Sequence, residues 1–237
     1  MAARRSGARR AGLALVLVVV VLALLIVVAD RVGQQVVERR VAQQLQTELG
    51  TASPPSVDIE GFPFVTQVLR RSFSSVHVVA EDVQAPDQPT KVKQVDLRLH
   101  DVTSQDNFAT STAARVDGTA TLDYPTAQKL TGQPLRYARE GRVEVSQPTD
   151  LMGVPVTARV IGRPVVDAAD QTLSLGDPEL TVAGVDVPDT TSKALLDSIV
   201  KPAPVRGVPF GLKIIDVTAM PEGLVAGVQG SDVTFSR

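Results

Sequence analysis

The sequence predicts an α+β protein, in which a long, curved antiparallel β-sheet wraps an amphipathic helix and a few short helices behind an N-terminal apolar helix. Three observations predict this fold: an uncharged run at residues 11–29, helical spacing of apolar residues over 31–50, and alternating segments after Pro55. Aromatic residues make up 3% of the chain and Trp is absent, so packing must depend on aliphatic side chains. Their β-branched members favour strands.

The uncharged run has the sequence AGLALVLVVVVLALLIVVA. At about 1.5 Å per residue it forms a helix of roughly 28 Å, close to the hydrocarbon thickness of a bilayer. Arginines precede it at positions 4, 5, 9 and 10, which favours a cytoplasmic N-terminus. We therefore predict a basic cytoplasmic tail over 1–10, a transmembrane anchor over 11–29, and an extracytoplasmic, periplasmic domain over 31–237.

A cleaved secretory signal is the alternative interpretation of the same run. Small residues at Val27, Val28 and Ala29 resemble a cleavage region, although signal cores usually extend over only about 7 to 15 apolar residues. Cleavage would yield a secreted domain, so both interpretations place the domain outside the cytoplasm. The chain has no cysteine, so the exported domain must be stable without disulfides.

Residues 31–50 predict an amphipathic helix. Its apolar residues recur near the helical period, at Val32, Val36, Val37, Val41, Leu45 and Leu49. Gly50 and the prolines at 54 and 55 end it. Such a helix is either a plain stalk or a helix that lies on a sheet or on lipid, and the apolar stripe favours the second interpretation.

The chain after Pro55 alternates between apolar and polar residues, as strands covered on one face do. The predicted strands are 57–60, 75–80, 92–99, 112–122, 135–145, 155–162, 172–182, 212–219 and 224–235. Turn residues at 117–118, 221–223 and 230–232 indicate antiparallel connections. Short helices are predicted over 125–130, before Gly132, and over 190–200, before Pro202.

The segment GFPF at 61–64 gathers aromatic residues in a chain that has few of them. Gly61 permits a turn that other residues resist, and Pro63 restricts the backbone, so the two rings take a defined arrangement. Candidate lipid-binding residues are Phe62, Phe64, Val65, Val68, Leu69 and Phe73, and candidate headgroup contacts are Arg70 and Arg71. The segment is either a tip that touches lipid or a hydrophobic plug that closes one end of the sheet.

Three blocks, VDIEGFPF at 57–64, VPFGL at 208–212 and PEGL at 221–224, carry a resemblance to a known family. In this order, behind an export signal, the chain resembles the LmeA-like phospholipid-binding family of actinobacterial exported proteins, which are tied to lipoglycan synthesis in the cell envelope. The resemblance implies a tubular lipid-binding-like fold that holds acyl chains between a curved sheet and a helix. It also implies phospholipid ligands, including inositol phospholipids, with no cofactor and no catalytic residues.

Other function classes have little support in the sequence. The chain has a net charge of −2 and few aromatics, which argues against nucleic-acid binding. Neither histidine, His77 or His100, has metal-ligand spacing, and the sequence contains no nucleophile elbow and no phosphate-binding glycine motif. We expect no metal and no enzymatic activity. Two alternatives stay open: a non-catalytic envelope adaptor that binds a protein, and a lipid hydrolase that uses His100 with Asp101.

Overall fold

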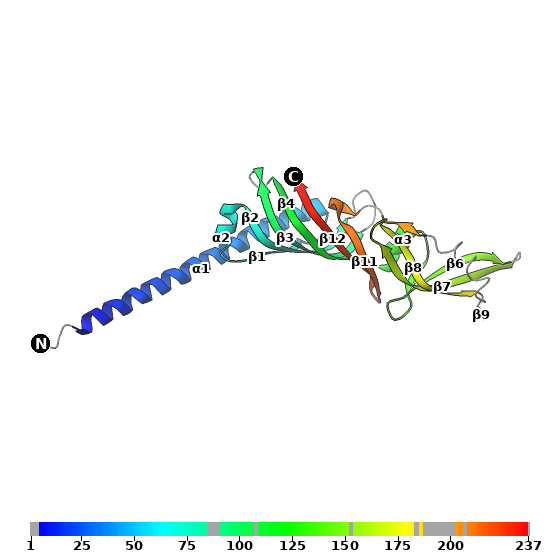
Figure 1. The fold of residues 1–237 in the computed structure, drawn as a ribbon, viewed down its shortest axis with the longest axis horizontal. Coiled ribbons are helices and arrows are strands. Elements are labelled where there is room, and N and C mark those ends of the chain that lie inside the picture. The colour runs from blue at the N-terminus through cyan, green and yellow to red at the C-terminus, as the bar shows by residue number, and fades with distance from the viewer. Residues whose placement is uncertain are drawn as a thin grey trace.

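One long helix joins the apolar run to the folded domain. The computed structural model describes residues 5–84, 91–106, 109–151, 154–182, 185–186, 202–205 and 208–236. Helix α1 (Arg5–Leu49) is continuous, and its apolar half extends away from the domain as a rod (Figure 1). The predicted anchor and the predicted amphipathic helix are therefore a single element. The helix ends at Gly50, whose φ of 62° is left-handed, as a C-terminal cap requires.

The C-terminal half of α1 packs against a six-stranded antiparallel sheet, which we call the first sheet. Its strand order is β1-β2-β3-β4-β12-β11. The strands are β1 (Ser56–Glu60), β2 (Ser72–Gln84), β3 (Lys91–Gln105), β4 (Thr110–Leu122), β11 (Lys213–Met220) and β12 (Gly223–Ser236). The short helix α2 (Phe64–Arg70) joins β1 to β2, beside α1 (Figure 1).

The remaining strands form a second antiparallel sheet, where a single sheet was predicted. Its order is β10-β8-β7-β6-β5, and β9 pairs with β8. The strands are β5 (Leu135–Tyr137), β6 (Val143–Leu151), β7 (Val154–Asp167), β8 (Thr172–Val182), β9 (Val185–Asp186) and β10 (Ala203–Pro204). The chain leaves the first sheet after β4 through helix α3 (Tyr124–Thr131), builds the second sheet, and returns through the 3-10 turn η2 (Pro209–Gly211). The two sheets follow one another along the long axis of the molecule (Figure 1).

The main core lies between α1 and the first sheet. The α1 residues that pack into it are Val37, Val41, Ala42 and Leu45. They meet apolar residues from every strand of the first sheet except β11, among them Ile59, Val102 and Val116. Val32 and Val36 of the predicted stripe are instead exposed, because the domain covers α1 on the opposite side at that level. The helix therefore lies on a sheet, as the stripe indicated, along the later part of its predicted length.

Two contacts hold the second sheet to the first. Ala127, Val143, Ala219 and Leu224 form an apolar cluster drawn from α3, β6, β11 and β12. In addition, the side-chain amide of Gln171, in the β7–β8 turn, pairs with the backbone of Ile214 in β11. Its Nε2 donates to the Ile214 carbonyl at 3.0 Å, and its Oε1 accepts from the Ile214 N–H at 2.9 Å. One side chain thus satisfies both backbone groups of a residue in the other sheet.

Each predicted strand overlaps an observed one, but two predicted turns are wrong. Asp117 and Gly118 lie inside β4, where a Cβ on Gly118 would fall 2.0 Å from the carbonyl oxygen of Asp96. Glycine is required there by a close approach of two strands. Residues 230–232 lie inside β12, where Asp232 takes a φ of 52° and is skipped in the pairing with β4. Segment 135–145 divides into β5 and β6, and the helix predicted over 190–200 lies outside the described residues.

Candidate functional site

Asp30, the first residue after the uncharged run, caps a helix that lies 34 residues further along the chain. Its two carboxylate oxygens accept hydrogen bonds from the backbone N–H groups of Phe64 and Val65, each at 2.9 Å. These are the first residues of α2, whose own N-cap, Pro63, provides no side-chain acceptor. A carboxylate at a helix N-terminus satisfies unpaired donors and interacts favourably with the helix dipole. Asp30 is 6% exposed, so α1 and α2 are joined by a buried contact.

The next turns of α1 bind the edge of the first sheet. Gln34 Nε2 donates to the carbonyl of Ile59 at 2.7 Å, and Glu38 accepts from the N–H of Ile59 at 2.9 Å. Gln34 also donates to Glu38 at 2.8 Å. Because Asp30, Gln34 and Glu38 are spaced four residues apart, they lie along one face of α1. That face therefore satisfies both outward backbone groups of Ile59 in β1, an edge strand whose free groups would otherwise be open to pairing.

The candidate lipid-binding residues fall into two groups. Phe64 and Phe73 are buried, with their ring centroids 6.5 Å apart, and Val68 packs against the same core. These three residues therefore belong to the main apolar core. The exposed group is Phe62, Val65 and Leu69, which are 56%, 56% and 80% exposed.

The charged residues near this segment are exposed. Arg70 lies in the last turn of α2, and Arg71 ends the helix in a left-handed conformation with φ of 52°. The guanidinium of Arg31 on α1 lies 5.8 Å from the centroid of the Phe62 ring, at a distance typical of a cation–π contact. None of these residues lines the cavity described next.

A cavity of about 230 Å³ lies on the inner face of the second sheet, away from the predicted residues. Most of its lining is apolar: Leu135, Val143, Val145, Pro164, Leu173, Leu175, Pro202 and Leu224. The polar lining residues are Thr131, Gln133 and Ser174. Small-molecule sites usually enclose about 300–1,000 Å³, so this cavity has room for part of an acyl chain. No local pattern marks this cavity in the sequence, because its lining comes from α3, both sheets and the two connections that contain Gln133 and Pro202.

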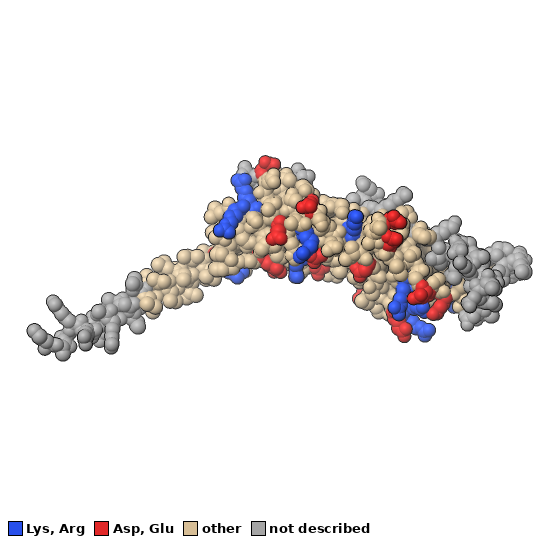
Figure 2. Space-filling model, in the orientation of Figure 1, with Lys and Arg blue, Asp and Glu red and all other residues tan. Residues whose placement is uncertain are grey.

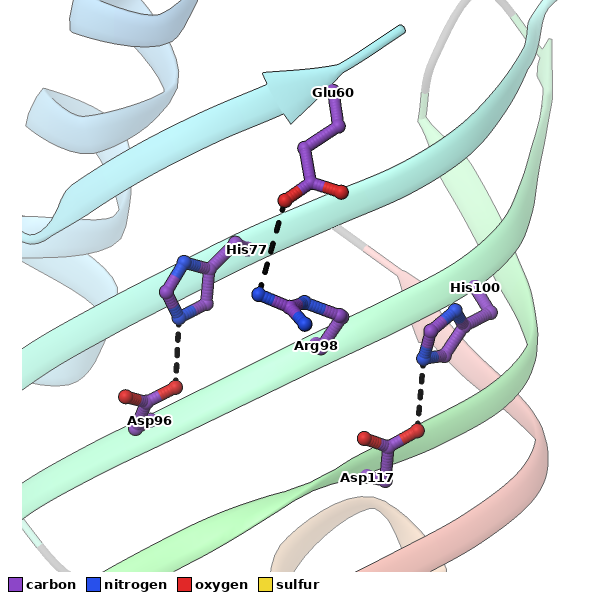
Figure 3. A network of polar contacts seen from close by, with 6 residues as sticks. All are labelled: Glu60, His77, Asp96, Arg98, His100 and Asp117. Atoms are coloured by element: carbon purple, nitrogen blue, oxygen red, sulfur yellow. Dashed lines mark hydrogen bonds and ion pairs between the residues drawn. The ribbon is translucent and has the colours of Figure 1, made fainter.

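The two histidines lie on the face of the first sheet opposite α1, where Figure 3 shows a row of cross-strand ion pairs. His77 Nε2 is 2.7 Å from Asp96, His100 Nε2 is 2.8 Å from Asp117, and Arg98 is 3.8 Å from Glu60. The carboxylates of these pairs are 42–46% exposed. The predicted pairing of His100 with Asp101 is wrong, because Asp101 has a φ of 50° and is skipped in the pairing of β3 with both neighbours.

The described residues contain no group of three or more His, Asp or Glu side chains that could hold a metal ion. Across the same part of the chain, α1 is the helix whose length and composition would allow it to cross a membrane. The alternative hydrolase function would have to use one of two His–Asp pairs. Both pairs are solvent-accessible and have the geometry of ordinary cross-strand contacts.

Comparison with protein families gives a match that extends from the end of the apolar run almost to the C-terminus. The model of the LmeA-like phospholipid-binding family matches residues 28–229. No curated protein and no solved structure gives a significant match to the chain. The family match includes Asp30, helix α2, both sheets except the last seven residues of β12, and every residue that lines the cavity. The chain therefore belongs to the LmeA-like phospholipid-binding family.

Proposed function

We propose that this protein binds a phospholipid outside the cytoplasm and holds part of an acyl chain in the cavity of the second sheet. The observation that carries the proposal is that the family match over 28–229 covers all eleven lining residues of a mostly aliphatic cavity. In this proposal α1 anchors the protein, with its N-terminus in the cytoplasm, and the bound lipid serves the biogenesis of cell-envelope lipids or lipoglycans.

The lining chemistry of the cavity supports an apolar ligand. Transfer of a methylene group out of water is worth about 0.8 kcal/mol, but a chain taken from a bilayer gains little of this, because it leaves one apolar environment for another. We therefore expect modest affinity and ready exchange. Of the polar lining residues, Thr131 and Ser174 already donate their hydroxyl protons to the carbonyls of Ala127 and Val165, so the lining favours the hydrocarbon part of a lipid. Inositol phospholipids belong among the ligands to test.

The test is native mass spectrometry of the full chain purified in mild detergent, with and without added phosphatidylinositol and phosphatidylglycerol. A Leu173→Trp variant should fill the cavity and remove most of the bound lipid. The matched control is Val165→Trp on the neighbouring strand β7, at a site that is 46% exposed and outside the cavity lining. It should retain lipid at the wild-type level, and thermal unfolding should show both variants folded.

Equal lipid occupancy in the two variants would show that the lipid does not bind in this cavity. A wild-type protein that carries no lipid under any of these conditions, and that captures an envelope protein instead, would favour the adaptor function.

A further inference from the structure

Helix α2 and the residues just before it expose several large apolar side chains. Outside α1, the described residues include eight large hydrophobic side chains that are exposed, and three of them, Phe62, Val65 and Leu69, fall within eight consecutive positions. Val65 and Leu69 are four residues apart and so lie on one side of α2. The opposite side of the helix is buried through Phe64 and Val68. The outer side of this short helix is thus an apolar surface with no partner in the fold.

The position of this surface relative to a bilayer follows from the length of α1. A helical run of nineteen residues measures about 28 Å, and the hydrocarbon core of a bilayer is about 30 Å thick. The whole run is therefore needed to span the hydrocarbon core. Asp30 must then lie at the hydrocarbon boundary. The headgroup layer beyond that boundary is about 5–8 Å deep on each side.

Two hydrogen bonds place α2 at the same level. The Asp30 carboxylate is 2.9 Å from the backbone nitrogens of both Phe64 and Val65, so the start of α2 lies within the headgroup layer. Figure 1 shows the same arrangement: α2 lies beside α1 at the end of the domain nearest the apolar half of that helix. The buried ring of Phe64 and the capped N-terminus fix α2 in this orientation.

The charges around α2 suit an anionic lipid surface. Arg31 lies next to Phe62, and Arg70 and Arg71 follow Leu69. Basic side chains gather at this end of the domain in Figure 2, whereas the α1 rod that leads to it carries no charged residue from 16 to 29. Basic residues near a membrane surface are attracted by anionic headgroups, and aromatic rings favour the interface between water and acyl chains.

We propose that α2 docks into the headgroup layer of the membrane that α1 spans, with Phe62, Val65 and Leu69 inserted among the upper parts of the acyl chains. This inference rests on α1 being retained as a membrane anchor, as in the proposed function. It makes the exposed half of the GFPF segment a contact with the bilayer itself, separate from the cavity of the second sheet. The domain is then held against the membrane by two elements joined through Asp30.

The composition of the chain allows a direct test, because it contains no Trp. Three single-Trp variants of the full chain are reconstituted in vesicles of phosphatidylcholine and phosphatidylglycerol, with lipids brominated at the top or at the middle of the acyl chains as quenchers. The variants are Phe62→Trp, Leu22→Trp near the centre of the apolar run, and Phe210→Trp. Phe210 is the control, since it is 50% exposed, close to the value for Phe62, and packs against Phe235 of β12.

We expect lipid brominated at the top of its chains to remove most of the emission of Phe62→Trp and to leave that of Phe210→Trp nearly unchanged. Leu22→Trp should be quenched most by bromine at the middle of the chains. If Leu22→Trp is quenched while Phe62→Trp behaves like Phe210→Trp, the anchor stands and the docking proposal fails, as it would if a protein partner covered α2. If Leu22→Trp is not quenched, anchor and docking both fail. Lipid in the cavity is measured separately by mass spectrometry, so the two proposals fail independently.

Discussion

The Asp30 carboxylate lies 2.9 Å from the backbone nitrogen of Phe64, so the first polar position after the apolar run supplies the N-terminal cap of α2. The helix that would cross the membrane and the helix that exposes Val65 and Leu69 are thereby coupled through one side chain. Asp30 is not among the residues of the main apolar core, so one substitution can remove this contact.

Replacement of Asp30 by Ala should lower the Tm of the full chain by several degrees, because two backbone donors at the start of α2 lose their acceptor. Asp30→Asn should lower it less, since its single carbonyl oxygen can still accept. Thermal unfolding in detergent, followed by circular dichroism, measures both. The control is Gln35→Ala at an exposed position of α1, and a Tm for Asp30→Ala as high as that of this control would contradict the prediction.

Phe62 and Phe64 should respond very differently to truncation. Phe64 is 4% exposed and Phe62 is 56% exposed. Phe64→Ala should reduce the free energy of unfolding by about 3–5 kcal/mol through the cavity that it leaves. Phe62→Ala should change it by no more than about 0.5 kcal/mol, as surface substitutions usually do. Chemical denaturation of the two variants in parallel gives the comparison, and similar losses in both would show that the segment is packed differently.

Gly61 should not tolerate a side chain. Its φ is 110°, and a Cβ there would lie 2.8 Å from Nε2 of Gln67 and 3.0 Å from Oγ of Ser74. Gly61→Ala should lower the free energy of unfolding by more than about 1 kcal/mol, because backbone strain and the steric clash of the added methyl both act at this position. Gly33→Ala is the matched control, because it lies within α1 with no atom near the added methyl, and it should stabilise the protein by about 1 kcal/mol. If Gly61→Ala and Gly33→Ala shifted the unfolding midpoint in the same direction, the prediction would be contradicted.

The cap of α3 should give a pH-dependent contribution to stability. Hydrogen bonding of Asp123 to the side chain and the backbone N–H of Thr126 lowers the pKa of the Asp123 carboxyl from its ordinary value of 3.8. A carboxyl whose pKa is lower in the folded state stabilises the fold fully above its unfolded pKa, and this stabilisation is lost as the pH falls through the folded pKa.

The stability difference between the wild type and Asp123→Asn should therefore be constant at neutral pH and should shrink below about pH 4. Urea denaturation between pH 7 and pH 3 measures it. A difference that grows as the pH falls would mean that the pKa is shifted in the other direction.

Strand positions were largely predictable, because alternation with period two is a local signal. In β3, Leu97 and Leu99 pack toward α1 while Arg98 and His100 lie on the other face, as their spacing indicated. The separation into two sheets was not predictable in this way. It depends on which strands pair across long stretches of chain, such as β4 with β12, and on the side chain of Gln171, which in sequence is only a polar turn residue.

The burial of individual residues in the GFPF segment was not predictable from the sequence. The GFPF segment is distinct in composition, but the sequence could not tell which ring turns inward, since that is decided by the cap that Asp30 provides from a distant helix. The dipeptide Asp117-Gly118 resembles a turn in the sequence. In the structure Gly118 lies inside β4, where the close approach of β3 leaves no room for a side chain. The cavity draws residues from 131 to 224 and has no local signature.

The end-to-end arrangement of the sheets determines how far the proposed lipid site lies from the apolar half of α1. The cavity opens in the sheet farther from the apolar half of α1 (Figure 1). If the cavity holds part of an acyl chain, as proposed, that chain must leave the bilayer to reach the far sheet, and the bound lipid then lies at the end of the domain remote from α1's apolar half.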